Sequence, residues 1–299
     1  MPRPWLVTGC RGQLGSALCD LLRARQVPFA GLAHAEVDIA DAGAVRALLS
    51  ARGPAGILNA AGFTHVDRCE REPALAARGN AEGPAVLAAA CREAGARLVH
   101  VSTDYVFPGD AARPYREDDP TGPRSVYGRT KLDGERAVLA SAHAFLVVRT
   151  SWVFGRGRNF LAAILDQAVK RRRGEASGPL RVVADQTGRP TYAADLAAGI
   201  WRLVELGAAG LYHLANEGVA TWWDLARLCL DEAGCRDLEV LKISSSELPP
   251  GAPRPAWSVL DTSKAASQGV ALRHYEAAVQ AYLHSEESPL RGPAWEGIH

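Results

Sequence analysis

Long apolar runs, paired cysteines and an excess of charge are all missing from this 299-residue chain. No segment approaches the run of about 20 apolar residues that a membrane helix needs, and the apolar start is too short for a signal peptide. The six cysteines form no C-x-x-C pair, which fits neither a disulfide framework nor a zinc site. We therefore expect a cytoplasmic protein with reduced thiols and no structural metal.

The charge is nearly balanced, because the sequence contains 34 Lys and Arg residues and 33 Asp and Glu residues. A net charge of +1 gives no general field that would hold nucleic acid or an anionic membrane, so we expect neither as a partner. Hydrophobic residues make up 47% of the chain, which excludes disorder. That content suits one large globular body, or two domains that share a cleft.

The first half alternates short apolar runs, typical of strands, with longer segments of helical period. Strands are expected at 5–8, 28–32, 56–59, 97–102 and 144–149, with helices at 14–25, 42–51, 74–94 and 125–140. This alternation predicts an α/β fold with a doubly wound parallel sheet. The second half is less regular, with helices expected at 160–173, 193–206 and 221–233, an isolated strand at 180–183 and a loop at 244–255.

We expect two units along the chain. Residues 1–150, with return segments around 180–215, would form the sheet domain, and residues 151–299 would mainly form a smaller α/β substrate-binding domain. In doubly wound sheets, ligands bind outside the carboxyl ends of the strands. The second unit is therefore expected to act as a lid over that edge.

A glycine-rich turn stands between the first expected strand and the first expected helix. Gly9, Gly12 and Gly15 are spaced as G-x-x-G-x-x-G, which permits a tight turn, close approach of a pyrophosphate and close packing of helix on strand. The sequence therefore predicts a dinucleotide site at the start of the helix. Its expected contacts are Gly9, Arg11, Gly12, Gln13, Leu14 and Gly15.

The end of the second strand lacks the acid that usually holds the ribose diol of such a cofactor. Ala33 and His34 stand there instead, and Asp38 and Ile39 follow as expected neighbours of the adenine edge. No carboxylate at this place would repel a 2′-phosphate, and Arg11 within the turn would attract one. We therefore expect NADPH to be preferred over NADH.

Three further residues indicate hydride transfer to a ketone. Tyr127 and Lys131 are four residues apart on an expected helix, so they share one face. A phenol can protonate the developing alkoxide if a nearby ammonium lowers its pKa from about 10. Thr103 ends the fourth strand and could donate a hydrogen bond to the substrate carbonyl.

With these residues in place, the chain resembles the extended short-chain dehydrogenase/reductases and, more narrowly, the dTDP-4-dehydrorhamnose reductase family. The resemblance runs nearly end to end, and the strings S-T-D-Y-V-F, R-T-S-W-V and D-Q-T-G-R-P-T are its most specific parts. The segments that carry it are 12–15, 59–70, 102–107, 127–132, 149–153, 185–191 and 254–264.

The resemblance implies a Rossmann-type fold and NAD(P)H-dependent reduction of the 4-keto group of a dTDP-6-deoxy-4-ketohexose. Tyr127 would be the proton donor, and Lys131 would modulate it and bind the cofactor. Further cofactor contacts would come from Ala60, Ala61, Gly62 and Asn80, and substrate contacts from Thr103, Asp104, Trp152 and Arg254. Arg254 is the candidate for the diphosphate, because a guanidinium binds phosphate oxygens in a fork.

Some assignments stay open within this resemblance. Members with magnesium use carboxylates near the C-terminus at a dimer contact, but Glu286, Glu287 and Glu296 do not match them clearly. A magnesium ion and a homodimer are therefore allowed rather than required. Gly62, Phe63 and His65 depart from the commonest residues of the family.

Those departures leave the substrate open. The first reading is the reductase that yields dTDP-L-rhamnose, and the second is a 4-ketoreductase for another dTDP-deoxysugar, for example of the dihydrostreptose type. A third is a non-catalytic NADP-binding subunit similar to the regulatory β subunit of methionine adenosyltransferase. The joint presence of Thr103, Tyr127 and Lys131 argues against the third. Trp222 and Trp223 begin an expected helix and are expected to be packing residues rather than a stacking platform for thymine.

Overall fold

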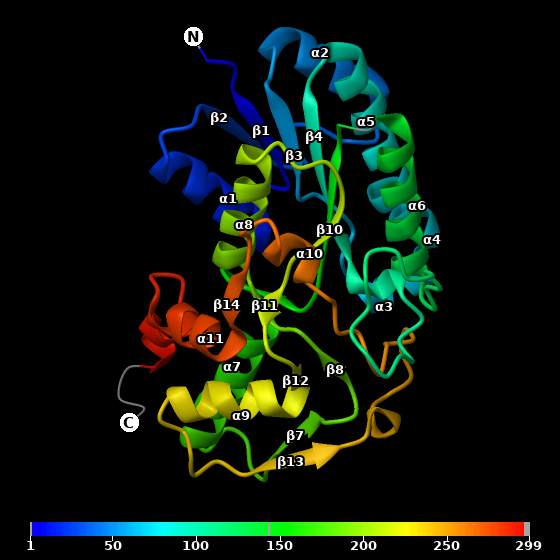
Figure 1. Ribbon diagram of the computed structural model, residues 1–299. Coiled ribbons are helices and arrows are strands. Elements are labelled where there is room, and N and C mark those ends of the chain that lie inside the picture. The colour runs from blue at the N-terminus through cyan, green and yellow to red at the C-terminus, as the bar shows by residue number, and fades with distance from the viewer. Residues whose placement is uncertain (1, 143, 296–299) are drawn as a thin grey trace.

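A parallel sheet of six strands forms the upper part of the molecule (Figure 1). This computed structural model describes residues 2–142 and 144–295. The strand order is β10-β5-β4-β3-β1-β2, and every neighbouring pair is parallel. The strands are β1 (Trp5–Thr8), β2 (Phe29–Leu32), β3 (Gly56–Asn59), β4 (Arg97–Thr103), β5 (Leu146–Thr150) and β10 (Gly210–His213). The predicted doubly wound parallel sheet is confirmed, and its order reverses between β1 and β3, where such sheets bind ligands.

Neighbouring residues of each central strand face opposite helical layers. Val7 and Leu58 belong to the core under one layer, whereas Leu6 and Ile57 belong to the core under the other. Burial on both faces explains why these strands are mostly apolar instead of alternating with polar residues. His100 of β4 and Arg149 of β5 are buried polar exceptions. One layer contains α1 (Gln13–Ala24) and α8 (Ala193–Glu205), and the other contains α2 (Ala42–Arg52), α5 (Gly83–Ala94) and α6 (Val126–Ser141).

The helix that was expected over 74–94 is interrupted. It consists of α4 (Pro73–Ala77), a π-helical turn over Arg78–Glu82, and α5. The π turn carries Asn80, whose backbone carbonyl comes so close to Gly134 of α6 that a Cβ there would collide with it. Such turns often mark functional positions, and this one directs the Asn80 side chain toward the loop after β3.

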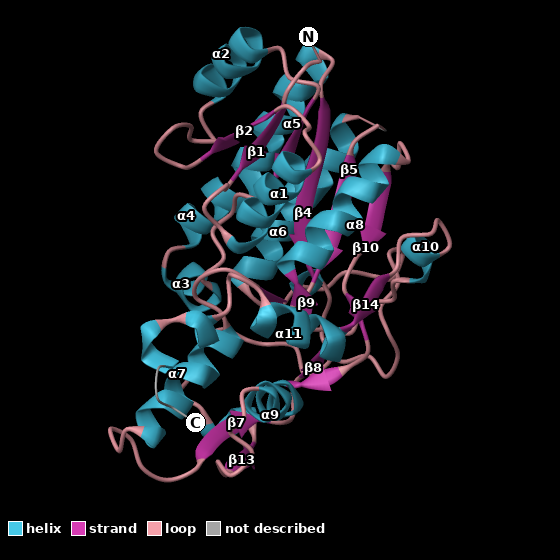
Figure 2. Ribbon diagram, turned by 90° about the vertical axis from the view of Figure 1, so that its left-hand side faces the viewer, coloured by secondary structure: helices cyan, strands magenta, loops and turns pink. Residues whose placement is uncertain are grey.

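The lower part of the molecule is built around a second core of helices and short strand pairs (Figure 2). Its main helices are α7 (Phe160–Arg172), α9 (Trp222–Glu232) and α11 (Tyr275–His284). The strand pairs are β6 (Val153–Phe154) with β9 (Thr191–Tyr192), β7 (Leu180–Val183) with β13 (Val240–Ile243), β8 (Thr187–Gly188) with β12 (Ala220–Thr221), and β11 (Asn216–Glu217) with β14 (Leu272–His274).

A strand does form at 180–183, but the prediction that it is isolated was wrong, because β7 pairs in parallel with β13. The middle of β13 is exposed at Leu241 and Lys242, so its sequence lacks the apolar run of a buried strand. The remaining elements are the helices α3 (Val66–Arg71) and α10 (Ser263–Ala266) and the 3-10 turns Asp104–Val106, Ser245–Glu247, Pro289–Arg291 and Pro293–Trp295. Across residues 2–142 and 144–295, no helix is both long and apolar enough to cross a membrane.

Candidate active site

The glycine turn has the close packing that its spacing predicts. Gly9 adopts a φ of 67°, which favours glycine, and a Cβ on Gly15 would collide with the Gly9 carbonyl oxygen. Gly12 caps α1 without a side-chain hydrogen bond, so the first backbone N–H groups of the helix remain available to an anion. The turn therefore fits the pyrophosphate of a dinucleotide, with Arg11 exposed beside it.

Neighbouring segments hold this turn from two sides. The backbone of Ala60 and Ala61, just after β3, lies so close to Gly9 that a side chain there would not fit. From the lower part of the molecule, the Arg158 carbonyl accepts a 2.7 Å hydrogen bond from the Gln13 side chain. The turn therefore lies where the sheet and the lower core meet.

The end of β2 differs from the expectation in one respect. The carboxylate of Glu36 accepts a 2.7 Å hydrogen bond from the backbone N–H of Ala33, so a carboxylate does stand at this strand end. Glu36 was not predicted because it follows the last residue of β2 by four positions, beyond the strand end where such an acid usually stands. Asp38 pairs with Arg78 at 2.6 Å, and a backbone hydrogen bond from Ala40, helped by Arg78, lowers the pKa of Asp38.

Two other predicted cofactor contacts have structural roles in this region. Ile39 is buried and packs at the start of α5, where a Cβ on Gly83 would collide with it. Asn80 is fully buried, accepts a 2.8 Å hydrogen bond from the Phe63 N–H and donates to the Phe63 carbonyl at 3.0 Å. Asn80 thus fixes the loop that begins at Gly62, and its contact with a cofactor stays a prediction.

Tyr127 lies in the first turn of α6, two residues after the capping residue Ser125. It is partly exposed, and its ring meets Tyr105 edge-on at 5.4 Å between centroids. Burial raises the pKa of Tyr127 above its ordinary value, and a hydrogen bond with Thr103 offsets part of this rise. The Lys131 Nζ donates to the Val101 carbonyl at 2.6 Å, and the lowering of the Tyr127 pKa by Lys131 stays a prediction.

Asp104 is a buried acid directly behind Thr103. Its Oδ1 accepts a 2.9 Å hydrogen bond from the Thr103 hydroxyl, and its Oδ2 has no hydrogen-bond partner in the described chain. Burial raises the pKa of Asp104 to about 6. While Asp104 is charged, the Thr103 hydrogen points at it, so Thr103 can accept from Tyr127 more readily than it can donate to a substrate.

Trp152 follows β5 with a φ of 48°, an uncommon conformation for a bulky residue. Its ring stacks on Trp222 with 3.6 Å between centroids and 4° between planes. A Cβ on Gly188 would lie 2.5 Å from the Trp152 ring, so the D-Q-T-G motif makes room for the indole. Trp222 packs against Trp152 and Phe160, as expected of a packing residue, and it also lines a cavity.

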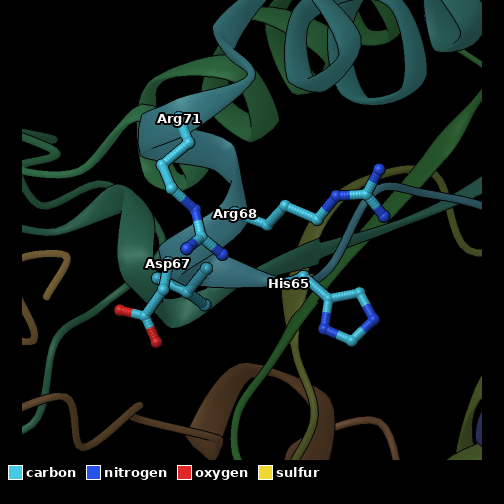
Figure 3. A pocket seen from close by; sticks show the side chains of 5 residues that line it. His65, Asp67, Arg68 and Arg71 are labelled. Atoms are coloured by element: carbon cyan, nitrogen blue, oxygen red, sulfur yellow. The ribbon is translucent and has the colours of Figure 1, made fainter.

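That cavity, of about 950 Å³, lies between α3, α7, α9 and the proline-rich loop over residues 248–254. Arg254 of that loop lines it and forms a 2.8 Å ion pair with Asp67 of α3. Arg71 lines it as well and extends to a smaller adjoining pocket of about 330 Å³, where its guanidinium lies near the Asp67 carboxylate (Figure 3). In the same view Arg68 and His65 lie on the other side of α3.

Two arginines therefore flank Asp67, whereas only Arg254 was predicted from the sequence. Arg71 follows Asp67 by four residues, so an i, i+4 pattern on α3 could have revealed it. Tyr105 connects the two halves of the site, because its ring contacts Tyr127 and its hydroxyl lies in the field of Arg254. The geometry thus brings Thr103, Tyr127 and Arg254 to one edge of the sheet.

The carboxylates near the C-terminus pair with arginines. Glu286 pairs with Arg291 at 3.0 Å and Glu287 with Arg156 at 3.2 Å, whereas Glu296 lies outside the described residues. Within the ranges that the structure describes, no three His, Cys, Asp or Glu side chains gather in a group that could hold a metal ion.

Comparison with known proteins agrees with this geometry. The family model described as the RmlD substrate binding domain matches residues 3–288. A dTDP-4-dehydrorhamnose reductase from Streptomyces griseus is 45% identical over 93% of this chain and 92% of its own length. A probable dTDP-4,6-dihydroxy-2-methyloxan-3-one 4-ketoreductase from Streptomyces antibioticus is 40% identical over 96% of this chain and 98% of its own.

A solved structure shares the whole architecture. The dTDP-4-dehydrorhamnose reductase of Bacillus anthracis, crystallised in complex with NADP, superposes with a TM-score of 0.89. It is 32% identical and covers 95% of this chain and 99% of its own. The match over nearly all of the chain shows that this protein belongs to the RmlD substrate binding domain family, the family of the dTDP-4-dehydrorhamnose reductases.

Proposed function

We propose that this protein reduces the 4-keto group of dTDP-4-dehydrorhamnose to give dTDP-L-rhamnose, with NADPH as the reductant. The observation that carries the proposal is the convergence of Thr103, Tyr127 and Lys131 at the carboxyl edge of a sheet whose first turn fits a dinucleotide. The reductases among its relatives, named above for this activity, support the same substrate.

The cofactor would be held by the chain's own backbone at the β1–α1 turn. The N–H groups of Gln13, Leu14 and Gly15 would bind the pyrophosphate, while Ala60, Ala61 and Lys131 would line the path to the nicotinamide. When bound, the reduced nicotinamide supplies the hydride that the carbonyl carbon receives.

Tyr127 would supply the proton that the carbonyl oxygen needs. Because burial raises the pKa of Tyr127, the phenol is protonated throughout the working range and is ready to donate. Formation of the phenolate then requires positive charge nearby, and we assign this task to Lys131. The Thr103 hydroxyl holds the phenol in place, in line with its effect on the Tyr127 pKa.

The substrate would lie in the 950 Å³ cavity next to the sheet edge. Arg254 and Arg71 would bind the diphosphate, for which Asp67 keeps both guanidinium groups in position. Trp152 would pack against the sugar. We propose accordingly that residues 1–150, with return segments from 180–215, bind the cofactor, and that residues 151–299 mainly bind the sugar nucleotide.

NADPH is preferred in this proposal because Arg11 lies exposed at the turn, where it can reach a 2′-phosphate. Glu36 opposes that preference, since its carboxylate lies at the end of β2. The bound NADP of the Bacillus anthracis relative supports the phosphorylated cofactor. Homodimer formation and magnesium binding are not needed for this chemistry.

A 4-ketoreductase for a different dTDP-deoxysugar is the second candidate, favoured by the Streptomyces antibioticus relative. Incubation with NADPH and either dTDP-4-dehydrorhamnose or its C3 or C5 epimers separates the two, with oxidation of NADPH followed by absorbance and the product by mass and NMR. Turnover of dTDP-4-dehydrorhamnose at the highest kcat/KM supports the first proposal. A hundredfold preference for an epimer supports the second, and cofactor binding without turnover would indicate a regulatory subunit.

A further inference from the structure

A chain of buried polar groups runs from the end of β1 to Lys131. The Thr8 hydroxyl donates to Asn59 Oδ1 at 2.7 Å, and Asn59 Nδ2 lies 3.0 Å from His100 Nδ1. On the far side of the ring, His100 Nε2 lies 3.4 Å from Lys131 Nζ. Thr8, Asn59 and His100 have no part in the reaction proposed above.

The direction of each hydrogen bond in this chain follows from one backbone group. The Ala61 N–H, which can only donate, lies 3.2 Å from Asn59 Oδ1, so this atom must be the amide oxygen. Asn59 Nδ2 then donates to His100 Nδ1, which must carry no proton. A neutral imidazole has one N–H, so the proton of His100 lies on Nε2 and points at Lys131 Nζ.

The surroundings of His100 favour its neutral form. The ring is fully buried, and burial together with the charge of Lys131 holds the pKa of His100 well below its ordinary value. An uncharged Lys131 amine can accept from Nε2–H with its lone pair while it donates to the Val101 carbonyl at 2.6 Å. An ammonium has no lone pair, so the same contact would set an N–H dipole against a positive charge.

We propose that His100 is a positioning residue for Lys131: its Nε2–H, fixed in direction by Asn59, binds the uncharged amine of Lys131 and opposes its protonation. One consequence rests on the proposed function: Lys131 would change its charge near the working pH of the enzyme. The hydrogen-bond directions themselves are properties of the protein without substrate.

The other side chains around Lys131 either favour its charged form, unlike His100, or carry no charge. Glu135, one turn along α6, raises the pKa of Lys131, but it is held by Arg149 of β5 through a 2.9 Å hydrogen bond. The π turn against α6 contributes an uncharged amide, because Asn80 donates to Thr130. Burial dominates these effects and lowers the pKa of Lys131 to about 8.

The first test reads the tautomer of His100 directly. Nitrogen-15 NMR of the cofactor-free protein distinguishes protonated from unprotonated ring nitrogens, and the His100→Asn variant identifies the His100 signals. We expect a neutral ring with the proton on Nε2 from pH 6 to 9. A proton on Nδ1, or on both nitrogens, would overturn the proposal whether or not the protein is a reductase.

The second test uses the pH dependence of kcat/KM. In His100→Asn the new amide oxygen can still accept from Asn59, but the side chain is too short to reach Lys131. In His100→Gln the longer side chain can turn its amide oxygen toward the Lys131 ammonium. The loss of kcat/KM at alkaline pH would report deprotonation of Lys131. We expect the midpoint of this loss to move to higher pH, by about half a unit in His100→Asn and by about one unit in His100→Gln. If activity falls in both variants while the midpoint stays in place, His100 is only a packing residue and the proposed reaction is unaffected.

Discussion

The indole rings of Trp152 and Trp222 lie parallel, 3.6 Å apart between centroids, although the two residues belong to different parts of the chain. Trp152 follows the last strand of the first half, and Trp222 opens α9. The stack packs against Trp152, which has an uncommon backbone conformation, and Trp222 itself lines the cavity proposed for the substrate. We therefore expect the specificity of the proposed sugar site to depend on Trp222, which the proposed reaction itself does not involve.

Replacement of Trp222 by alanine should raise KM for the sugar nucleotide about tenfold and leave KM for NADPH unchanged. The reason is the loss of the stacking contact, since such aromatic pairs contribute about 0.5 to 1.5 kcal/mol beyond buried area. Steady-state kinetics with each substrate varied in turn measures the effect. The matched control is Trp223→Ala, because Trp223 stacks under Lys242 and donates to the Val240 carbonyl away from the cavity. Equal KM changes in both variants would contradict this role of Trp222.

Replacement of Tyr127 by phenylalanine should lower kcat by about 10² to 10⁴, the usual contribution of a proton donor. Binding of NADPH should change less than threefold, because the ring and its contact with Tyr105 remain. Fluorescence titration of the cofactor and single-turnover kinetics separate the two quantities. Tyr105→Phe is the control, and full activity of Tyr127→Phe would show that the proton comes from another group.

Asp104→Asn should stabilise the protein at neutral pH and slow the reaction. The folded-state pKa of Asp104 is raised from 3.8 to about 6, so the contribution of Asp104 to the free energy of unfolding is fully present below pH 4 and is lost as the pH rises through 6. Asparagine does not titrate, so its advantage should grow from near zero at pH 4 to at most about 3 kcal/mol at pH 7. Urea unfolding at both pH values measures this difference, and an advantage independent of pH would be inconsistent with a buried charge.

The preference between the two cofactors should respond in opposite directions at two positions. Arg11→Ala should lower the ratio of kcat/KM for NADPH over NADH about tenfold, through loss of a charge-assisted contact with the 2′-phosphate. Glu36→Gln should raise the same ratio, because it removes the carboxylate at the end of β2. Arg3→Ala serves as the control, since Arg3 binds backbone carbonyls at Gly53 and Pro54. Unchanged ratios in both variants would exclude this account of the cofactor preference.

The sheet was predictable from the sequence because its strands are buried on both faces. The runs that end at Thr8, Asn59 and Thr150 are mainly apolar, with Arg149 as the charged exception, and the glycine turn fixes the position of the first helix. The pairing of β7 with β13 was not predictable from the sequence. Leu241 and Lys242 are exposed, so β13 lacks the apolar pattern of a buried strand. The paired residues are also 60 positions apart in the chain, and no local pattern connects them.

The candidate site was predictable in its motifs but not in its contacts. Thr103, Tyr127 and Lys131 follow from spacing on a strand end and a helix, which are local properties. The contact of Glu36 with Ala33, the pairing of Asp67 with Arg254 and the stack of Trp222 on Trp152 depend on how loops fold back. The uncommon backbone of Trp152 likewise arises from tertiary packing rather than from its neighbours in sequence.

The central claim is that this chain reduces a 4-keto dTDP-sugar through Tyr127. Its most direct test is to incubate the purified protein with dTDP-4-dehydrorhamnose and NADPH deuterated at the transferred position, and to identify the product by mass and NMR. We predict dTDP-L-rhamnose with a single deuterium at C4, formed by the wild type and reduced at least a hundredfold in Tyr127→Phe. Recovery of unchanged substrate with the wild type, while NADPH binds normally, would contradict the account.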